Sequence, residues 1–288
     1  MNVFYYGLSA LACCLIWAAG ATAQTPQTEA GPISELQAAQ LRPETLDAVF
    51  SGDETMHYAV SWSGGVKIGD IHLNIRPEKS QPGAYVIAAK VKDYGPLAVF
   101  YPVDDAFRCM VDGPMKLPYR YEVEQREGYG RETTRLTLFD QEERVVRYQK
   151  NKGQTEIFTL AGAAYNEFAS FIITRALAFR EGEEIVVPTF ADKKRHEVRV
   201  SVLQREKRAT IFGDRETLKV QPKMHFKGLY DKSGDTILWI TDDRCRVPVE
   251  IHSKIVVGSL VAELVDYANS ACPELNTAVK GRSQAKAK

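Results

Sequence analysis

The fold is decided by residues 54–77, which read ETMHYAVSWSGGVKIGDIHLNIRP. Apolar side chains occupy alternate positions on both sides of the Gly64-Gly65 pair. A period of two places successive side chains on opposite faces of a strand, so each run predicts a strand with one buried face. The two glycines between the runs are typical of a tight hairpin turn. The alternation slips by one residue near Gly69, which predicts a β-bulge in the second strand.

The same period continues through most of the chain, in short runs separated by glycine, aspartate or asparagine. Regularly spaced short strands of this kind predict an antiparallel sheet that curves into a half-barrel or closes into a barrel. Only NEFASFIITRALAFREGE, residues 166–183, has the apolar spacing of a helix, with Asn166 as its N-cap and Gly182 as its terminator. Strands and helices do not alternate, which excludes a Rossmann-type sheet. The predicted fold is therefore mostly β: a curved antiparallel sheet, half-barrel or barrel, with one packed amphipathic helix.

The first 23 residues carry no charged side chain and contain an apolar run at positions 8–19. This run is too short to span a bilayer comfortably, and the A-T-A at positions 21–23 fits the small-residue pattern of a signal cleavage site. We interpret residues 1–23 as a cleaved secretory signal peptide, which predicts a periplasmic protein. An uncleaved anchor is the alternative, because no positive charge precedes the apolar run.

Composition divides the rest of the chain into three parts. Residues 24–49 are polar with scattered proline and glycine and are predicted to form a linker. Residues 50–268 contain the strands and form a single β-rich domain, and residues 269–288 are predicted to be a disordered basic tail. Basic and acidic residues balance at 37 each, which argues against a nucleic-acid partner because phosphate binding needs a basic excess. No stable membrane span is expected after signal cleavage, because no later apolar stretch is long enough.

Signal cleavage leaves three cysteines, Cys109, Cys245 and Cys272. In an oxidising compartment this odd number predicts one disulfide and one free thiol. Cys109 and Cys245 both fall in predicted strands, so we take them as the candidate pair, while the sequence leaves the other pairings open. Neither the cysteines nor the five histidines have the spacing of metal ligands, so we predict no metal and no cofactor.

Two adjacent aspartates precede a cysteine both in VDDAFRCMVD, residues 103–112, and in TDDRCRVPVE, residues 241–250. Paired carboxylates can bind Ca²⁺ or act as acid and base. Each pair offers only two ligands, however, and stands where a turn is expected. Aspartate is favoured in turns because its side chain bonds its own backbone, so we interpret both pairs as structural turns. The sequence does not decide whether Asp105 and Asp243 approach each other.

Two aromatic-rich segments are candidates for the lining of a ligand cavity. One is GPLAVFYPV, residues 95–103, and the other is the helix. A helix laid across the concave face of a curved sheet would plug or line a cavity there. The alternative is that these rings simply fill the core. The candidate cavity residues are Phe100, Tyr101, Phe168, Phe171 and Phe179.

Four stretches carry a family resemblance: DETMHYAVSWSGGVKIGDIHLNI, YPVDDAFRCMVD, LPYRYEVEQREGYGR and LWITDDRCRVPVEIHSKIVVGSLVAELVDY. The last is the most specific, with W-I-T-D-D followed by R-x-P-V-x-I-x-S-K and G-S-x-x-A-E-L. Together they resemble a family of secreted bacterial proteins, domain of unknown function 3108, across residues 50–268. The resemblance implies a largely β protein of the periplasm or cell surface. It implies no particular activity and no catalytic residue.

The sequence is compatible with three functions. The leading hypothesis is a non-enzymatic periplasmic protein that binds an apolar or amphipathic ligand, such as a lipid or lipoprotein anchor, by analogy with other half-barrels. The second is a structural or protein-interaction module of the cell envelope, with an envelope protein bound at an exposed edge strand. The third is an envelope hydrolase. The chain lacks the G-x-S-x-G and H-E-x-x-H motifs, so we predict no catalytic residue.

Overall fold

The computed structural model describes residues 35–95, 98–99, 101–180, 182–224, 236–254 and 258–275. The helices within them are η1 (Ala38–Gln40), α1 (Pro43–Phe50) and α3 (Glu167–Thr174). The strands before α3 are β1 (Glu54–Trp62), β2 (Val66–Pro77), β3 (Tyr85–Asp93), β4 (Asp104–Asp112), β5 (Leu117–Arg126), β6 (Glu132–Asp140), β7 (Val145–Lys150), β8 (Glu156–Thr159) and β9 (Tyr165–Asn166). The strands after it are β10 (Glu184–Ala191), β11 (Lys194–Thr210), β12 (Gly213–Met224), β13 (Thr236–Thr241), β14 (Pro248–Lys254) and β15 (Ser259–Ala268).

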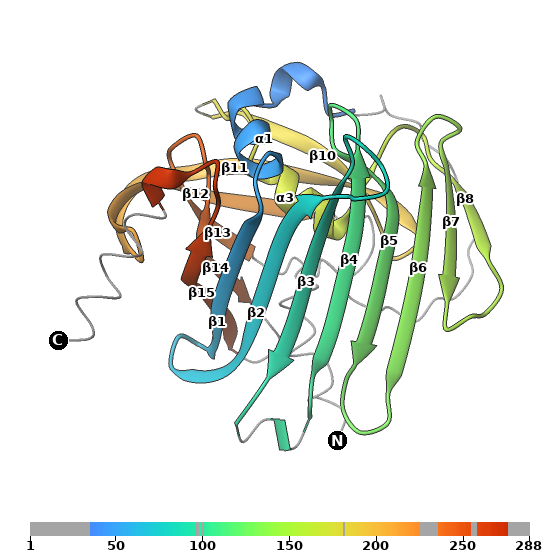
Figure 1. Ribbon diagram of the computed structural model, residues 1–288, viewed down its shortest axis with the longest axis horizontal. Helices are drawn as coiled ribbons and strands as arrows, with labels where there is room; N and C mark the ends of the chain where they lie inside the picture. Colours follow the sequence, from blue (N-terminus) through green and yellow to red (C-terminus); the bar gives the residue numbers. More distant parts are fainter. Residues whose placement is uncertain are drawn as a thin grey trace.

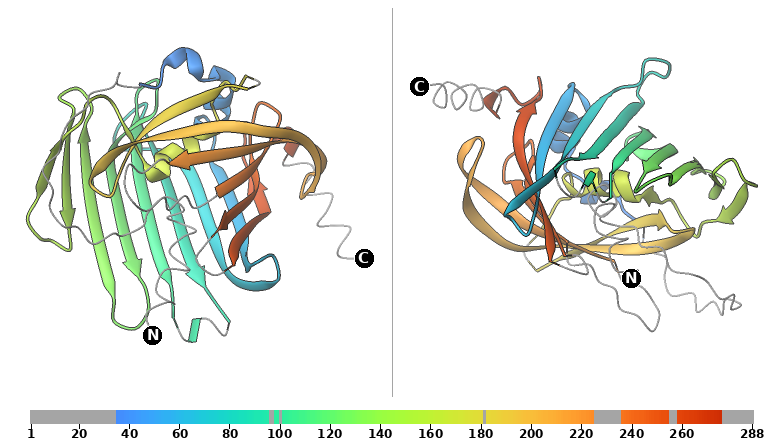
Figure 2. Two further views of the ribbon diagram at one scale, coloured as in Figure 1. Left: turned by 180° about the vertical axis from the view of Figure 1, so that it is seen from behind. Right: turned by 90° about the horizontal axis from the view of Figure 1, so that it is seen from below.

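All 15 strands belong to one sheet, built from two meanders that meet at a seam. Strands β1 to β8 neighbour each other in sequence order and form what we call the N-terminal arm. Strands β15 back to β10 do the same, with the short β9 parallel to β10 at the edge, and form the C-terminal arm. The seam is the antiparallel pair β1–β15. The two arms curve toward each other (Figure 1, Figure 2), which confirms the predicted mostly β, curved antiparallel sheet.

The hairpin predicted around Gly64 is present and joins β1 to β2. Gly64 has a φ of +74°, a conformation that glycine adopts without strain. The pairing shifts between Val60, opposite Gly69, and Ser61, opposite Lys67, which confirms the predicted bulge. At Gly69 a Cβ atom would lie 2.7 Å from a carbonyl oxygen of β3, so the close approach of the two strands there requires glycine.

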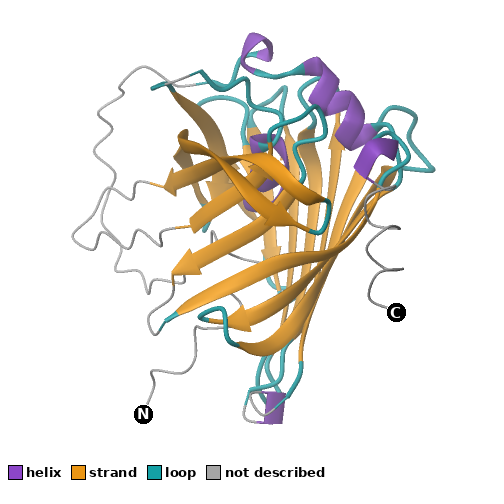
Figure 3. Ribbon diagram, turned by 90° about the vertical axis from the view of Figure 1, so that its left-hand side faces the viewer, coloured by secondary structure: helices purple, strands orange, loops and turns teal. Residues whose placement is uncertain are grey.

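The sheet is curved but unclosed, because β8 and β9 remain its two edges. Figure 3 shows the curved sheet from the side, with its strands in orange. Side chains bridge the space between the arms instead of backbone hydrogen bonds. The ring of Phe158 on β8 lies 5.6 Å from that of Phe190 on β10. Beside this contact, Lys193 Nζ lies 2.6 Å from Glu156 Oε1. The half-barrel alternative of the prediction therefore describes the structure, and the closed barrel does not.

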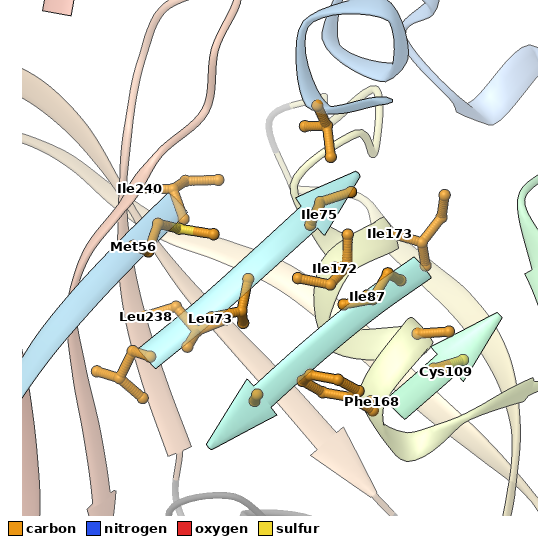
Figure 4. Packing of buried hydrophobic residues seen from close by; sticks show 14 of the residues in the cluster. Met56, Leu73, Ile75, Ile87, Cys109, Phe168, Ile172, Ile173, Leu238 and Ile240 are labelled. Carbon is orange, nitrogen blue, oxygen red and sulfur yellow. The ribbon is translucent and has the colours of Figure 1, made fainter. Parts of the chain in front are cut away.

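Helix α3 lies inside the curve, between the two arms (Figure 2). Its N-cap is Asn166, as predicted, whose side chain accepts a hydrogen bond from the backbone nitrogen of Ala169 (2.6 Å). Seven of its eight residues are buried, the polar Glu167, Ser170 and Thr174 among them, and only Phe171 is partly exposed, so the helix is enclosed on almost every side. Its apolar side chains form the centre of the core with residues of both arms (Figure 4): Phe168, Ile172 and Ile173 with Met56, Leu73, Ile75, Ile87, Leu238 and Ile240.

The helix ends at Thr174, well before Gly182, where the sequence predicted its end. The guanidinium of the next residue, Arg175, lies in a buried ion pair with Glu54. Two residues later, Leu177 forms an isolated β-bridge with Leu41. These tertiary contacts override the helical propensity of the segment.

The predicted domain limits are too narrow at both ends. All of helix α1 except its last residue lies in the segment 24–49 predicted as a linker, yet its Ala48 and Val49 belong to the core. At the other end, Cys272 and Leu275 are buried, although the tail was predicted to begin at residue 269. A few apolar residues in a polar segment were enough to anchor it, and average composition does not reveal them.

Two predicted segments lie outside the described residues. They are the signal peptide at 1–23 and the remainder of the basic tail at 276–288, and both stay predictions. Among the residues that the structure does describe, none of the helices has the length and hydropathy to cross a membrane.

Candidate ligand site on the concave face

An apolar cavity of about 70 Å³ lies between α3 and the two arms. Its walls come from β1–β3, from α3 and from β11–β14, and include Ile71, Leu73, Ala89, Phe171, Leu238 and Ile251. Phe171 is the one residue of α3 that is not buried, and it faces this space. Atoms that line an unfilled cavity lose dispersion contacts, so such a space costs stability unless something occupies it.

The concave face turns from apolar to polar beyond the cavity. Because opposite residues of paired strands share a face, one row of side chains crosses the N-terminal arm from β2 to β6. The row runs Leu73, Ala89, Phe107, Val123 and Arg135. It therefore begins at the cavity and ends on a cation. We call the polar side chains around this cation the polar band: Tyr101, Asp105, Gln125, Glu127 and Arg135.

Hydrogen bonds connect the polar band from end to end. Arg135 Nη2 donates to Gln125 Oε1 (3.2 Å). Gln125 Nε2 in turn donates to Asp105 Oδ2 (3.3 Å) and to Glu127 Oε1 (3.0 Å). The Tyr101 hydroxyl donates to Glu127 Oε2 (3.2 Å). Two carboxyl groups thus share the amide nitrogen of Gln125, and the oxygen of the same amide accepts from the guanidinium of Arg135.

The two carboxyls of the polar band also share a proton. Asp105 is fully buried, and burial together with the charge of Glu127 raises the pKa of Asp105 to about 7. Burial also raises the pKa of Glu127, while hydrogen bonds from Tyr101 and Asp105 lower it. Like charges this close cannot both ionise at low cost. The pair therefore keeps a proton toward neutral pH.

Glu167, the first residue of α3, stands between the cavity and a smaller polar pocket. It lines the apolar cavity and also a pocket of about 20 Å³ that is shared with Arg135 and Tyr148. Its side chain is buried, and burial raises its pKa, while the nearby Arg135 lowers it. A carboxyl that is readily protonated can donate as well as accept a hydrogen bond. The apolar cavity thus has a polar group at its border.

The structure separates the aromatic residues that the sequence grouped. Phe168 and Phe171 line the cavity. Tyr101 belongs to the polar band, because its hydroxyl requires a partner when it is partly buried. The ring of Phe179, which lies beyond the end of α3, stands 5.9 Å from the guanidinium of Arg246 and does not line the cavity. Phe100 lies outside the described residues.

The two aspartate pairs lie at opposite ends of the sheet and have different roles. Asp243 Oδ1 accepts hydrogen bonds from the backbone nitrogens of Cys245 (2.9 Å) and Arg246 (3.0 Å), which confirms the predicted turn between β13 and β14. Asp104 is an outward-facing strand residue 3.5 Å from Lys90. Asp105 points inward to the polar band, so the interpretation of this pair as a mere turn was incomplete.

The predicted disulfide between Cys109 and Cys245 is wrong. Cys245 is bonded to Cys272, and Cys109 is a buried free thiol. Cys109 lies on β4 inside the core, where the side-chain amide of Asn166 donates to its sulfur (3.1 Å). Cys245 is not in a strand, as the prediction assumed, but in the turn after β13, where the C-terminal segment with Cys272 passes.

A buried ion pair between Arg175 and Glu54, which was not predicted from the sequence, lies at the end of the sheet that contains Asp243. Arg175 forms two bonds with Glu54, from Nη1 to Oε2 (2.6 Å) and from Nη2 to Oε1 (2.8 Å), and neither side chain is more than 1% exposed. The Tyr267 hydroxyl also donates to Glu54 (3.0 Å). Arg175 further donates to the carbonyl oxygens of Cys245 (2.9 Å) and Arg246 (2.8 Å). The pair therefore joins β1, β15, the end of α3 and the turn that carries the disulfide.

Comparison with known proteins shows the fold and the family. The crystal structure of a beta-barrel-like protein of domain of unknown function DUF1849 from Brucella abortus is similar, with a TM-score of 0.55 and 9% sequence identity. The match covers 77% of this chain and 99% of that one, and at this identity it is a likeness of fold. No curated protein matches the sequence. The family model described as protein of unknown function, DUF3108, matches residues 55–265. The expected resemblance is therefore confirmed, and the chain belongs to the DUF3108 family.

Proposed function

We propose that this protein is a non-enzymatic binding protein of the periplasm that holds an apolar or amphipathic molecule, such as a lipid or the acyl chain of a lipoprotein, on its concave face. The observation that carries the proposal is the apolar cavity between the arms, toward which the partly exposed Phe171 points from an otherwise buried helix. A core without a ligand function would be expected to fill this space.

The neighbouring polar groups favour an amphipathic ligand over a purely apolar one. Ligand sites combine apolar walls with a few placed polar groups that fix the orientation of the ligand. Here Glu167 borders the cavity, and Arg135 follows it in the adjoining pocket. An apolar chain in the cavity would place a polar head next to these two side chains.

The cavity is smaller than most ligand sites, which hold about 300–1,000 Å³. At about 70 Å³ it accommodates only part of an acyl chain. The proposal therefore includes a movement of the Phe171 ring on binding, because this ring is partly exposed whereas the other residues of α3 at the cavity are buried. A tryptophan at this position should then report binding by a change in fluorescence.

A substitution that fills the cavity tests the proposal. Ala89 lines the cavity, whereas its neighbour Ala88 points to the other face of β3. Ala89→Trp is expected to weaken binding of the neutral fluorescent probe phenylnaphthylamine about tenfold or more, which corresponds to about 1.4 kcal/mol. Ala88→Trp is the matched control and should bind the probe like the wild type. Equal binding by both variants, or no binding by the wild type, would contradict the proposal.

A second candidate function is protein interaction at the edge strand β8. Its Ile157 is 66% exposed, and one side of the strand has no neighbour in the sheet. Such an edge can receive a strand from another protein. If an envelope protein copurifies with the wild type and is lost from Ile157→Asp, while no probe binds in the cavity, this second function would replace the first.

A further inference from the structure

Exposed apolar side chains gather at one end of the sheet. Seven large apolar residues of the described chain are exposed, and three of them lie within strands, away from the first and last strand residues: Ile157, Leu203 and Val265. The other four lie in or beside the β1–β2, β3–β4 and β5–β6 connections: Val66, Tyr94, Val99 and Tyr129. Because consecutive strands are antiparallel, these three connections share one end of the sheet, at the lower edge of Figure 1, which we call the hairpin end.

The opposite end of the same strands serves as an internal comparison. Its connections are β2–β3, β4–β5 and β6–β7, at residues 78–84, 113–116 and 141–144. None of the exposed large apolar residues falls in these three segments, all of which are described. Turn tips are normally occupied by polar residues and glycine. The apolar tips at the hairpin end are therefore a property of that end and not of the sheet in general.

Two of the apolar tips are joined into one unit. The Tyr129 hydroxyl donates to the backbone oxygen of Val99, and Gly128 N donates to Pro102 O (2.8 Å). These bonds connect the β3–β4 and β5–β6 connections. Tyr129 is 75% exposed and Val99 65% exposed in this arrangement, so the bonds present the two side chains to solvent instead of burying them. Such a fixed, exposed apolar patch is typical of an interaction surface.

The exposed charges around the tips are mainly positive. Lys67, Lys92, Arg126 and Arg131 are exposed beside the three connections. Among the described residues 63–67, 92–104 and 126–132, Glu132 is exposed and pairs with Arg126 (3.1 Å), and the half-exposed Asp104 lies 3.5 Å from Lys90. Apolar and tyrosine tips surrounded by basic residues match the surface of a bilayer, where tyrosine lies at the headgroup level and cations attract anionic lipids.

We propose that the hairpin end docks on the surface of a lipid bilayer that contains anionic phospholipid. Val99 and Tyr129 enter the headgroup region, and the surrounding lysines and arginines contact lipid phosphates. This inference is independent of the proposed ligand binding, because none of the four apolar tips lines the cavity.

Cosedimentation of the exported chain with vesicles tests the proposal. The vesicles consist of phosphatidylcholine, with or without phosphatidylglycerol. The double variant Val99→Ser with Tyr129→Ser is expected to lose about tenfold or more of its binding to the anionic vesicles, because it removes two apolar side chains from the contact. The matched control, Ile157→Ser with Leu203→Ser, removes two exposed apolar residues elsewhere and should bind like the wild type. All four positions are exposed, so the fold should tolerate both pairs.

The electrostatic part has its own test. Lys67→Glu with Lys92→Glu is expected to weaken binding to the anionic vesicles and to leave the weaker binding to pure phosphatidylcholine unchanged. Added salt should reduce wild-type binding because it screens the attraction. Equal binding by both serine variants would overturn the proposal, as would a wild type that binds neither kind of vesicle. A wild type that binds both kinds equally would overturn the requirement for anionic lipid.

Discussion

Arg175→Met is expected to lower the free energy of unfolding by about 3–5 kcal/mol, because it leaves the Glu54 carboxylate buried without its partner. The guanidinium makes two bonds to Glu54 and two to backbone carbonyl oxygens, all of which the variant loses. Urea unfolding, followed by circular dichroism with the disulfide intact, measures the loss. The reciprocal Glu54→Leu should lower the free energy of unfolding by a similar amount, because it leaves the Arg175 guanidinium buried without its carboxylate partner.

The double variant Glu54→Leu with Arg175→Met is the control for this expectation. It removes both charges, so it should be more stable than either single variant. The Tyr267 hydroxyl and the Asn269 amide still lose an acceptor in it, so full recovery is not expected. If the losses of unfolding free energy in the two single variants simply add in the double variant, the two side chains are not energetically coupled. The ion pair would then not be what stabilises this end of the sheet.

Asp105→Asn is expected to stabilise the protein above neutral pH. An aspartate in the unfolded chain loses its proton near pH 4, whereas the pKa of Asp105 in the folded protein is about 7. The unfolded state therefore holds fewer protons than the folded state between these values, and stability falls as pH rises through this window. Above this window the folded protein has lost the full amount of stability, on the order of 2–4 kcal/mol. Part of this loss belongs to Glu127, because the two carboxyls titrate as a pair. The variant escapes this cost because its amide cannot ionise.

The amide also preserves two contacts of the protonated acid and loses one, the hydrogen bond that Asp105 Oδ2 accepts from Gln125 Nε2 (3.3 Å). Its oxygen can accept from the backbone nitrogen of Arg126, as Asp105 Oδ1 does (3.0 Å), and its nitrogen can donate to Glu127. Unfolding of both proteins at about pH 5 and about pH 8 should show the advantage of the variant growing with pH. Asp104→Asn, one residue away on the outer face, should show little change at either pH. An advantage that is the same at both pH values would mean that Asp105 is ionised throughout.

Periodicity was a sufficient guide to the sheet because it reports which face of each strand is buried. The hairpin at Gly64 and the bulge at Gly69 both followed from the phase of the apolar residues. The helix followed from a change of period, and its N-cap was correct. Its end was not, because the contacts of Arg175 come from residues distant in sequence, such as Glu54, 121 positions away.

The candidate site was only partly accessible from sequence. Aromatic content selected Phe168 and Phe171, which line the cavity, but also Tyr101 and Phe179, which do not, because composition does not report where a ring points. The buried charged residues could have been predicted from their positions in the sequence pattern, which aromatic content does not consider. Glu54 stands in phase with the buried Met56 and Tyr58, and Arg175 continues the apolar spacing of the helix. A charged residue in an inward phase needs a buried partner, and a search for such residues would have found both.

The pairing of β1 with β15 has a consequence for the order in which the chain assembles. Thr55 lies opposite Ala268, so β1, the first strand to be synthesised, cannot complete its pairing until β15, the last strand, has been made. Until β15 arrives, β1 exposes a backbone edge that invites association with other chains. Such non-local closure makes folding slow, and the vulnerable period lasts from the synthesis of β1 until β15 pairs with it. A truncation that removes only β15 should therefore convert the whole N-terminal arm into an aggregation-prone sheet, although every residue of that arm is still present.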